Sequence, residues 1–290
     1  MTSPTGPGSA AEVAERYGLS RSGARPSMRE YAAQLWQRRH FIVAYARARS
    51  TTLYSGSVLG SLWQLLTPLL NAAVYYLIFG LLLQSDRGIE NFPAFLVAGV
   101  FVFTFTQRAV LAGGRSISGN LGLVRALHFP RAALPLAVTV MELQLVLVST
   151  VVLMAIVVAT GEPVTLSWLL LVPALVLQTL FNCGLALTFA RLSSRVRDVE
   201  QLMPFALRTW QYGSGVFFSI AVVAASTPQV VRVLLEVNPA AVYIEIVRDA
   251  LMTSHGAPGY TWLLAGAWAV VAFCGGFVYF WKAEELYGRG

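Results

Sequence analysis

The sequence predicts an all-α polytopic membrane protein with six transmembrane helices. Its 290 residues are 56% hydrophobic and only 12% charged, and six apolar stretches reach the roughly 20 residues that a helix needs to cross a bilayer. These stretches are 58–83, 92–111, 134–159, 166–190, 202–224 and 260–281. No polar stretch is long enough for an independent soluble domain, so we expect one transmembrane domain over 28–290.

Basic residues mark one side of the predicted bundle. Of the 21 Lys and Arg, sixteen lie in the N-terminal segment, the second-to-third connection, the fourth-to-fifth connection or the tail, and three lie in the other connections. Because cytoplasmic loops are enriched in Lys and Arg, we expect a multi-pass protein of the plasma (inner) membrane with both termini in the cytoplasm. The spread of the basic residues over four segments argues against nucleic-acid binding.

The N-terminal segment divides into a tail and a helix. Residues 1–27 are rich in Ser, Gly, Pro and Ala, which predicts a disordered cytoplasmic tail. Residues 28–50 predict an amphipathic helix lying on the inner leaflet, and the alternative is a solvated helix that packs against another subunit. Four of its side chains share one face at helical spacing: Tyr31, Leu35, Ile42 and Tyr45.

Two connections carry helical patterns too polar to span. The second-to-third connection, 113–130, has six apolar residues and a break near its middle, which predicts a short amphipathic helix that needs a partner surface. The fifth-to-sixth connection places helical patterns at 229–237 and 240–252 around Asn238-Pro239. We expect two short re-entrant helices at the outer mouth, with a plain extracellular cap as the alternative.

Several catalytic and metal-binding devices are missing. The only lysine, Lys282, is followed by Ala283, so the phosphate-binding loop that ends in Lys-Ser/Thr is absent. The three histidines lie outside the spans and far apart, which predicts no metal site. The ionisable residues inside spans are Arg108, Glu142 and Arg208, which are candidates for function or, for Arg108 with Glu142, for a structural pair. We therefore expect a transporter subunit with no cofactor rather than an enzyme.

Short motifs follow one another in a definite order relative to the spans. Their order and placement resemble the permease subunit of the ABC-2 family, and within it the exporters of lipid-linked polysaccharides of the O-antigen and teichoic-acid type. The resemblance covers about 38–281. The motifs are Gly-Ser-Val-Leu-Gly-Ser-Leu-Trp at 56–63, Pro-Leu-Leu at 68–70, Tyr-Tyr-Leu-Ile-Phe-Gly at 75–80, Asn-Phe-Pro-Ala-Phe-Leu at 91–96, Asn120, His-Phe-Pro-Arg at 128–131, Leu-Pro at 134–135, Arg-Asp-Val at 197–199, Asn-Pro at 238–239 and Arg-Asp at 248–249.

The resemblance implies a homodimer that works with two separate ATPase subunits, which would carry ATP and Mg. It also implies that the N-terminal helix and the 113–130 connection contact the ATPase, and that the helices after the fifth span form an outer gate. The ATPase contact is expected at Arg39, Asn120, Leu123, Arg125, His128 and Phe129. The outer gate is expected at Asn238, Pro239, Tyr243 and Ile246, with Tyr243 and Ile246 nearest the axis.

A channel lined mainly by the first and fifth spans is a further implication of the resemblance. Aromatic faces can stack on sugars without fixing their register, and a guanidinium suits a diphosphate. The expected channel residues are Tyr75, Tyr76, Phe79, Phe205, Arg208, Trp210, Tyr212 and Phe217. The implied cargo is a polysaccharide linked to a polyprenyl diphosphate, and the Arg-rich composition suggests a cell-wall galactan in an actinobacterium. The alternatives are an ABC-2 permease for small lipophilic drugs and a membrane enzyme that acts on lipid-linked sugars.

Overall fold

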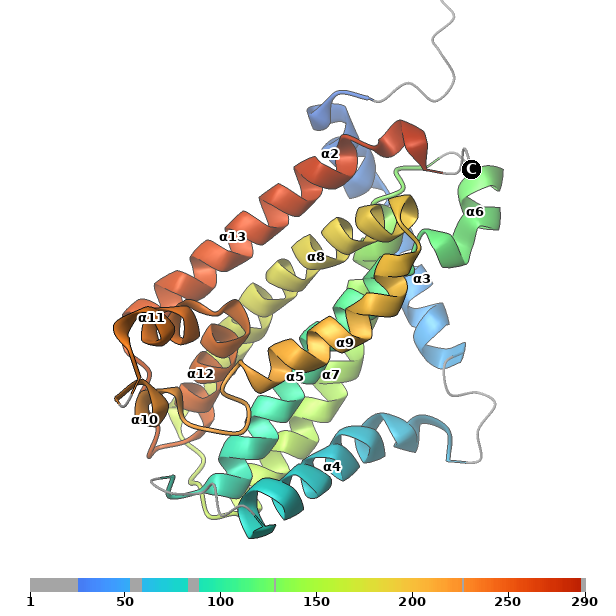
Figure 1. Ribbon diagram of the computed structural model, residues 1–290. Coiled ribbons are helices and arrows are strands. Elements are labelled where there is room, and N and C mark those ends of the chain that lie inside the picture. Colours follow the sequence, from blue (N-terminus) through green and yellow to red (C-terminus); the bar gives the residue numbers. More distant parts are fainter. Residues whose placement is uncertain (1–25, 53–58, 83–88, 128, 226, 288–290) are drawn as a thin grey trace, which may run out of the picture.

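The computed structural model describes residues 26–52, 59–82, 89–127, 129–225 and 227–287, and within them all regular structure is helical (Figure 1). Five segments are long and apolar enough to cross a membrane, namely Leu65–Leu82, Phe92–Gly114, Ala133–Ala159, Leu166–Arg195 and Tyr260–Trp281. The all-α membrane architecture is therefore confirmed. The tail predicted at 1–27 lies almost entirely outside the described residues.

The predicted fifth span is not one continuous helix. It is divided into α9 (Asp198–Tyr212) and the short α10 (Ile220–Ala225) by a non-helical segment at 213–219. Gly215, within this break, has a φ of 67°, a left-handed conformation that glycine adopts without a steric penalty. The sequence Gly213-Ser-Gly215 indicates a break at this place, although hydropathy averaged over the stretch 202–224 does not detect it. The stretch 202–224 is not among the five described segments that are long and apolar enough to span a membrane, so the sixth span stays a prediction.

The centre of the bundle is α5 (Phe92–Gly114), in which 78% of the residues of an apolar 18-residue stretch are buried. The side chain of Asn91 caps its first turn by accepting from the amide of Ala94 at 3.2 Å. Helices α7 (Ala133–Ala159) and α8 (Leu171–Arg195) pack around α5. A 3-10 turn at Leu166–Leu170 comes directly before α8. The last span, α13 (Tyr260–Trp281), packs along α8 (Figure 1).

Helices α8 and α13 come into backbone contact. A Cβ added to Gly184 would lie 2.2 Å from the carbonyl carbon of Ala272, and one added to Gly276 would lie 2.2 Å from the carbonyl oxygen of Gly184. Small residues allow such an approach between helices in a membrane, where close packing stabilises association. These two glycines therefore set the distance between α8 and α13.

One end of the bundle, here called the basic end, collects segments that are distant in the sequence. It carries α2 (Met28–Gln37), the start of α3 (Arg39–Thr52), α6 (Leu121–Ala126) and the C-terminal 3-10 turn at Glu284–Leu286 (Figure 1). The helix predicted at 28–50 is thus two helices that meet at Arg38. Ser27 and Glu30 cap α2 reciprocally, and α3 packs against α7.

A buried hydroxyl anchors α2 to the bundle. Tyr31 is 1% exposed, donates to Oε2 of Glu284 at 2.6 Å and accepts from the amide of Ala132 at 3.0 Å. Burial raises the pKa of Glu284, while hydrogen bonds from Arg131 and Tyr31 partly offset the rise. Burial likewise raises the pKa of Tyr31 well above its ordinary value, so its hydroxyl stays protonated and able to donate.

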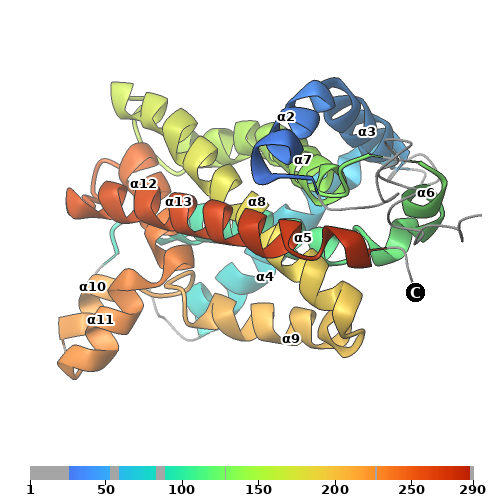
Figure 2. The same ribbon diagram turned by 90° about the horizontal axis from the view of Figure 1, so that it is seen from above.

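The first span lies at the periphery. It is made of α4 (Trp63–Tyr75) and its π-helical continuation at Tyr76–Leu82. Only 11% of the residues in Leu65–Leu82 are buried. This span packs against α5 and α7, and its end at Tyr75 and Phe79 meets Phe217 in the segment after α9. At the end of the bundle opposite the basic end are α10, α11 (Gln229–Val237) and α12 (Pro239–Leu251) (Figures 1 and 2).

Candidate substrate-facing surface

Four of the predicted channel residues form one aromatic cluster between the first span and the break after α9. The ring of Phe217 stacks on Phe79 with centroids 4.5 Å apart, meets Tyr75 edge-on at 4.8 Å and lies 5.4 Å from Tyr212. Phe217 is buried while Tyr212 is half exposed. The cluster therefore joins a peripheral helix to the rest of the bundle and presents aromatic edges at its surface.

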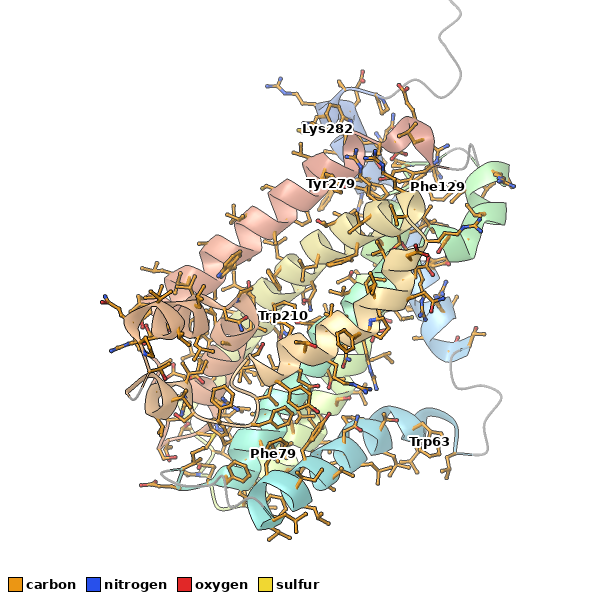
Figure 3. The ribbon with its side chains drawn as sticks, viewed as in Figure 1. Trp63, Phe79, Phe129, Trp210, Tyr279 and Lys282 are labelled. Atoms are coloured by element: carbon orange, nitrogen blue, oxygen red, sulfur yellow. The ribbon has the colours of Figure 1, made fainter. Side chains whose placement is uncertain are left out.

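The other four predicted channel residues make no ring contact with this cluster. Tyr76 turns toward Phe92, with ring centroids 6.4 Å apart, and Trp210 meets Phe103 edge-on at 5.7 Å. Figure 3 labels Trp210 on α9 and, at a separate position, Phe79 near the end of the first span. Two members are on the exposed face of α9, namely Phe205, which is 74% exposed, and Arg208. Arg208 is close enough to Tyr75 to act on its hydroxyl electrostatically.

The break between α9 and α10 is held by a buried guanidinium on α12. Arg248 is 0% exposed and donates to the carbonyls of Phe95 at 3.0 and 3.1 Å, Gly215 at 2.9 Å and Val216 at 3.1 Å. It also pairs with Glu245 at 3.2 Å. The negative ends of the carbonyl dipoles and the carboxylate of Glu245 face the positive guanidinium, which compensates for removing it from water. We call this arrangement the Arg248 clamp.

Sequence reasoning missed the clamp. It placed Arg248 in the Arg-Asp motif and among the basic residues of an outer connection, but gave it no role. A signal was present, because the helical pattern around Arg248 is otherwise apolar on the same face, with Ile244 and Leu251 both buried. A charge within such a face needs an internal partner.

Asn238 connects the break to the turn that precedes α12. Its amide oxygen accepts from the indole of Trp210 at 2.8 Å and from the amide of Ala240 at 3.1 Å. Its amide nitrogen donates to the carbonyl of Gly213 at 3.0 Å. The Asn-Pro turn between two short helices lies where the sequence predicted it.

The structure corrects the placement of Tyr243 and Ile246, which we expected nearest the channel axis. Both are at most 1% exposed, and Tyr243 donates to the carbonyl of Ala265 at 2.8 Å and packs on Phe181. Because α12 is covered by α5, α8 and α13, its apolar side chains point into the protomer rather than toward an open surface. Of the predicted gate residues, Asn238 and Pro239 remain partly exposed.

Comparison with known proteins places the chain in a family. Residues 40–252 match the model of the ABC-2 type transporter family. The chain belongs to this family. It is 25% identical over 255 residues to the O-antigen export system permease protein RfbA of Myxococcus xanthus, covering 88% of this chain and 94% of that protein. It is 27% identical over 211 residues to a protein of the same name from Klebsiella pneumoniae, covering 72% and 78% of the two chains. It is also 25% identical over 203 residues to the polysialic acid transport protein KpsM of Escherichia coli, covering 70% and 75%.

ABC-2 permeases work with ATPase subunits, and the residues predicted for that contact fall into two groups in this permease. Leu123 and Phe129 pack into the protomer's own cluster at the basic end, with Phe129 5.7 Å from Phe41. Asn120 accepts from the hydroxyl of Tyr45 at 2.8 Å. Two arginines are exposed, Arg39 and Arg125, and Arg39 lies over the indole of Trp36 at 5.2 Å. The predicted contact at His128 lies outside the described residues.

Two of the ionisable residues inside spans of the permease lie together. Arg108 and Glu142 line one cavity of about 20 Å³ beneath Pro68 of the first span. Glu142 is buried and Arg108 acts on it electrostatically. Arg208 does not line this cavity, so the structure separates it from the Arg108–Glu142 pair.

Proposed function

We propose that this ABC-2 permease is the transmembrane subunit of an exporter of lipid-linked polysaccharide. Two copies would pair with two ATPase subunits and move a glycan on a polyprenyl diphosphate from the cytoplasm to the outer face of the plasma membrane. Similarity to permeases named for O-antigen export and polysialic acid transport supports this class of cargo. A cell-wall galactan in an actinobacterium is the specific cargo that the Arg-rich composition favours.

The observation that carries the proposal is the uncovered face formed by the first span and α9. Large apolar side chains on this face are exposed in the protomer, and the Phe217 cluster lies at its inner edge. An apolar face of this kind needs lipid or a second copy to cover it. The exposed members are Leu70, Val74, Leu77, Leu81, Leu202 and Phe205.

Aromatic edges on this face suit a cargo that must slide. A sugar presents C–H groups that pack on aromatic rings, while its hydroxyls need polar partners. Tyr75 and Tyr212 offer both a ring and a hydroxyl, and Arg208 adds a positive charge close to Tyr75. A guanidinium on an exposed helix face suits the diphosphate that would precede the glycan.

The same proposal assigns the two ends of the bundle. The basic end would face the cytoplasm, in agreement with the positive-inside rule, and α2 and α3 would lie at the inner leaflet. The turn at Asn238-Pro239, together with α11 and α12, would close the outer mouth. Helix α11 supports this role because apolar side chains and the Arg232–Glu236 pair, 2.8 Å apart, share its exposed surface.

Depletion of the permease in its native host tests the proposal. Lipid-linked glycan should accumulate in the inner leaflet while glycan at the cell surface falls, as measured by labelling intact and lysed cells. Phe79→Ala should lower surface glycan several-fold per folded molecule, whereas Tyr260→Ala, which removes a half-exposed aromatic from α13, should not. Unchanged surface glycan after depletion would refute the proposal.

Arg208 provides a second readout. Arg208→Ala should reduce export more than it reduces the yield of folded protein, and Arg208→Lys should retain part of the export because the charge remains. If yield collapses and export per molecule is preserved, Arg208 is structural.

A further inference from the structure

A pocket of about 530 Å³ opens at the basic end of the permease. Its wall is formed by the last turn of α8, the connection to α9, the start of α6 and the C-terminal turn. The spans α8 and α13 end at Arg195 and Trp281 beside it. The pocket therefore lies at the depth where a bilayer changes from hydrocarbon to head groups.

Among the residues that the structure describes, three arginines line this pocket and no carboxylate does. They are Arg191, Arg195 and Arg197. Two carboxylates next to the pocket have partners of their own, since Glu200 accepts from the lining residue Ser118 at 2.7 Å and lies 3.9 Å from Arg115, and Glu284 accepts from Tyr31. The pocket thus has a concentrated positive charge whose natural complement is an anion.

Arg191 is held in place by Tyr279 and has no acidic partner within the described part of the chain. Its guanidinium lies 4.0 Å from the ring centroid of Tyr279 and donates to the backbone carbonyl of the same residue. This contact ties the end of α8 to α13. One face of the guanidinium is therefore occupied by protein, while the group still lines the pocket.

A buried hydroxyl in the pocket wall has no partner. Ser193 is 1% exposed and lines the pocket, and in the part of the chain that the structure describes its Oγ makes no hydrogen bond. Buried hydroxyls are normally paired, because an unpaired one has lost its hydrogen bonds to water. This hydroxyl is closed off from the pocket and lies near Gly114 of α5, so it belongs to the packing between α8 and α5.

Apolar side chains complete the wall. Leu121 and Leu286 line the pocket beside the arginines, and Leu286 is largely exposed. A small soluble anion would gain nothing from them. A charged head group attached to a hydrocarbon chain would meet both the arginines and the leucines.

We propose that this pocket binds the phosphate head of a membrane lipid, with Arg195 and Arg197 as its ligands. The chemistry suits two sources, an anionic phospholipid or the polyprenyl diphosphate that carries the glycan, and the second source rests on the proposed function. Arginine pairs with phosphate oxygens through parallel N–H donors. The pocket lies apart from the Phe217 cluster, since no residue of that cluster lines it.

Lipid binding to the purified full-length permease tests the proposal. Four probes are compared by native mass spectrometry in detergent, namely a long-chain polyprenyl diphosphate, the corresponding polyprenol, phosphatidylglycerol and phosphatidylcholine. Binding should require the phosphate, and Arg195→Gln with Arg197→Gln should weaken it by about tenfold for each arginine. Arg232→Gln, on the exposed surface of α11, is the matched control and should bind as the wild type does.

The outcomes separate the two sources. Preference for the polyprenyl diphosphate over phosphatidylglycerol assigns the pocket to the carrier, and equal binding assigns it to phospholipid. Equal binding of polyprenol and polyprenyl diphosphate, or unchanged binding in the double variant, overturns the proposal. So does a double variant that binds lipid normally but loses its ATPase subunit, because the arginines then form a protein interface. Depletion that leaves glycan export unchanged refutes the proposed function alone and leaves the phosphate site standing.

Discussion

Replacing Arg248 with Met should destabilise the permease by several kcal/mol. The guanidinium donates to three backbone carbonyls, those of Phe95, Gly215 and Val216, and pairs with Glu245. A buried acceptor left without its donor costs about 1–3 kcal/mol, and removing one partner of a buried ion pair costs about 3–5 kcal/mol. The carbonyl of Phe95 and the carboxylate of Glu245 keep other partners, since His255 contacts Glu245 at 2.6 Å. The carbonyls of Gly215 and Val216 are left without this donor, and at about 1–3 kcal/mol each they give an expected loss of about 4 kcal/mol.

The two cysteines supply the assay. Cys183 is buried and Cys274 is exposed, so in a Cys274→Ser background a thiol-reactive dye reports only the unfolding that uncovers Cys183. At roughly 2 °C per kcal/mol for a chain of this size, Arg248→Met should lower the melting temperature by about 8 °C. The melting temperature of Arg248→Lys should lie between those of wild type and Arg248→Met, because one ammonium cannot reach all three carbonyls.

Arg232→Met is the control for the loss of an arginine. Its ion pair with Glu236 is on the exposed surface of α11, where such pairs contribute about 0–1 kcal/mol. A melting temperature for Arg248→Met that is no lower than that of Arg232→Met would refute the account of the clamp.

Three further substitutions test other parts of the structure. Gly184→Ala should lower the yield of folded protein, because its methyl group would meet the backbone of α13, whereas Gly275→Ala enters open space and should not; equal yields would contradict the packing. Burial raises the pKa of Glu284 in the folded protein. The difference in stability between wild type and Glu284→Gln should therefore be largest below the ordinary carboxyl pKa of about 4.3 and decline as the pH rises through the folded pKa. Melting temperatures of both proteins from about pH 4 to pH 8 measure this difference, and parallel curves would contradict the prediction. Leu127 is 52% exposed, so Leu127→Asp should uncouple ATP hydrolysis from export without changing the melting temperature. Phe129→Asp should instead lower the melting temperature. If ATP hydrolysis and export stay coupled in Leu127→Asp, the surface around Leu127 is not part of the ATPase contact.

The helices that end at local signals were predictable from the sequence. The pattern around Asn238-Pro239 predicted helices at 229–237 and 240–252, and α11 and α12 occupy 229–237 and 239–251. Proline at the first helical position and a side-chain oxygen before it determine such a boundary locally. Hydropathy in the same way predicted the positions of the five continuous spans.

Features that depend on distant partners could not be predicted. Gly213-Ser-Gly215 marked the break in the fifth span, but not its stabilisation by the Arg248 clamp. Tyr31 is likewise buried against a carboxylate 253 residues further along the chain. Which face of α12 packs against the bundle could not be predicted for the same reason. Its sequence is apolar on several faces, so the pattern alone does not show that Tyr243 points inward. Site residues on α4 and α9 were brought together only by packing around Phe217.

The Arg248 clamp also imposes an order on biosynthesis. The carbonyl of Gly215 accepts from a guanidinium 33 residues later in the chain, and an unpaired carbonyl within a bilayer is costly. At about 5–20 residues per second, Arg248 is synthesised about 2–7 seconds after Gly215. During that interval the nascent segment at 213–219 needs water, an insertase or the mouth of the translocon to satisfy its backbone. A chain that terminates before Arg248 therefore presents a permanently open helix break to the proteases of membrane quality control.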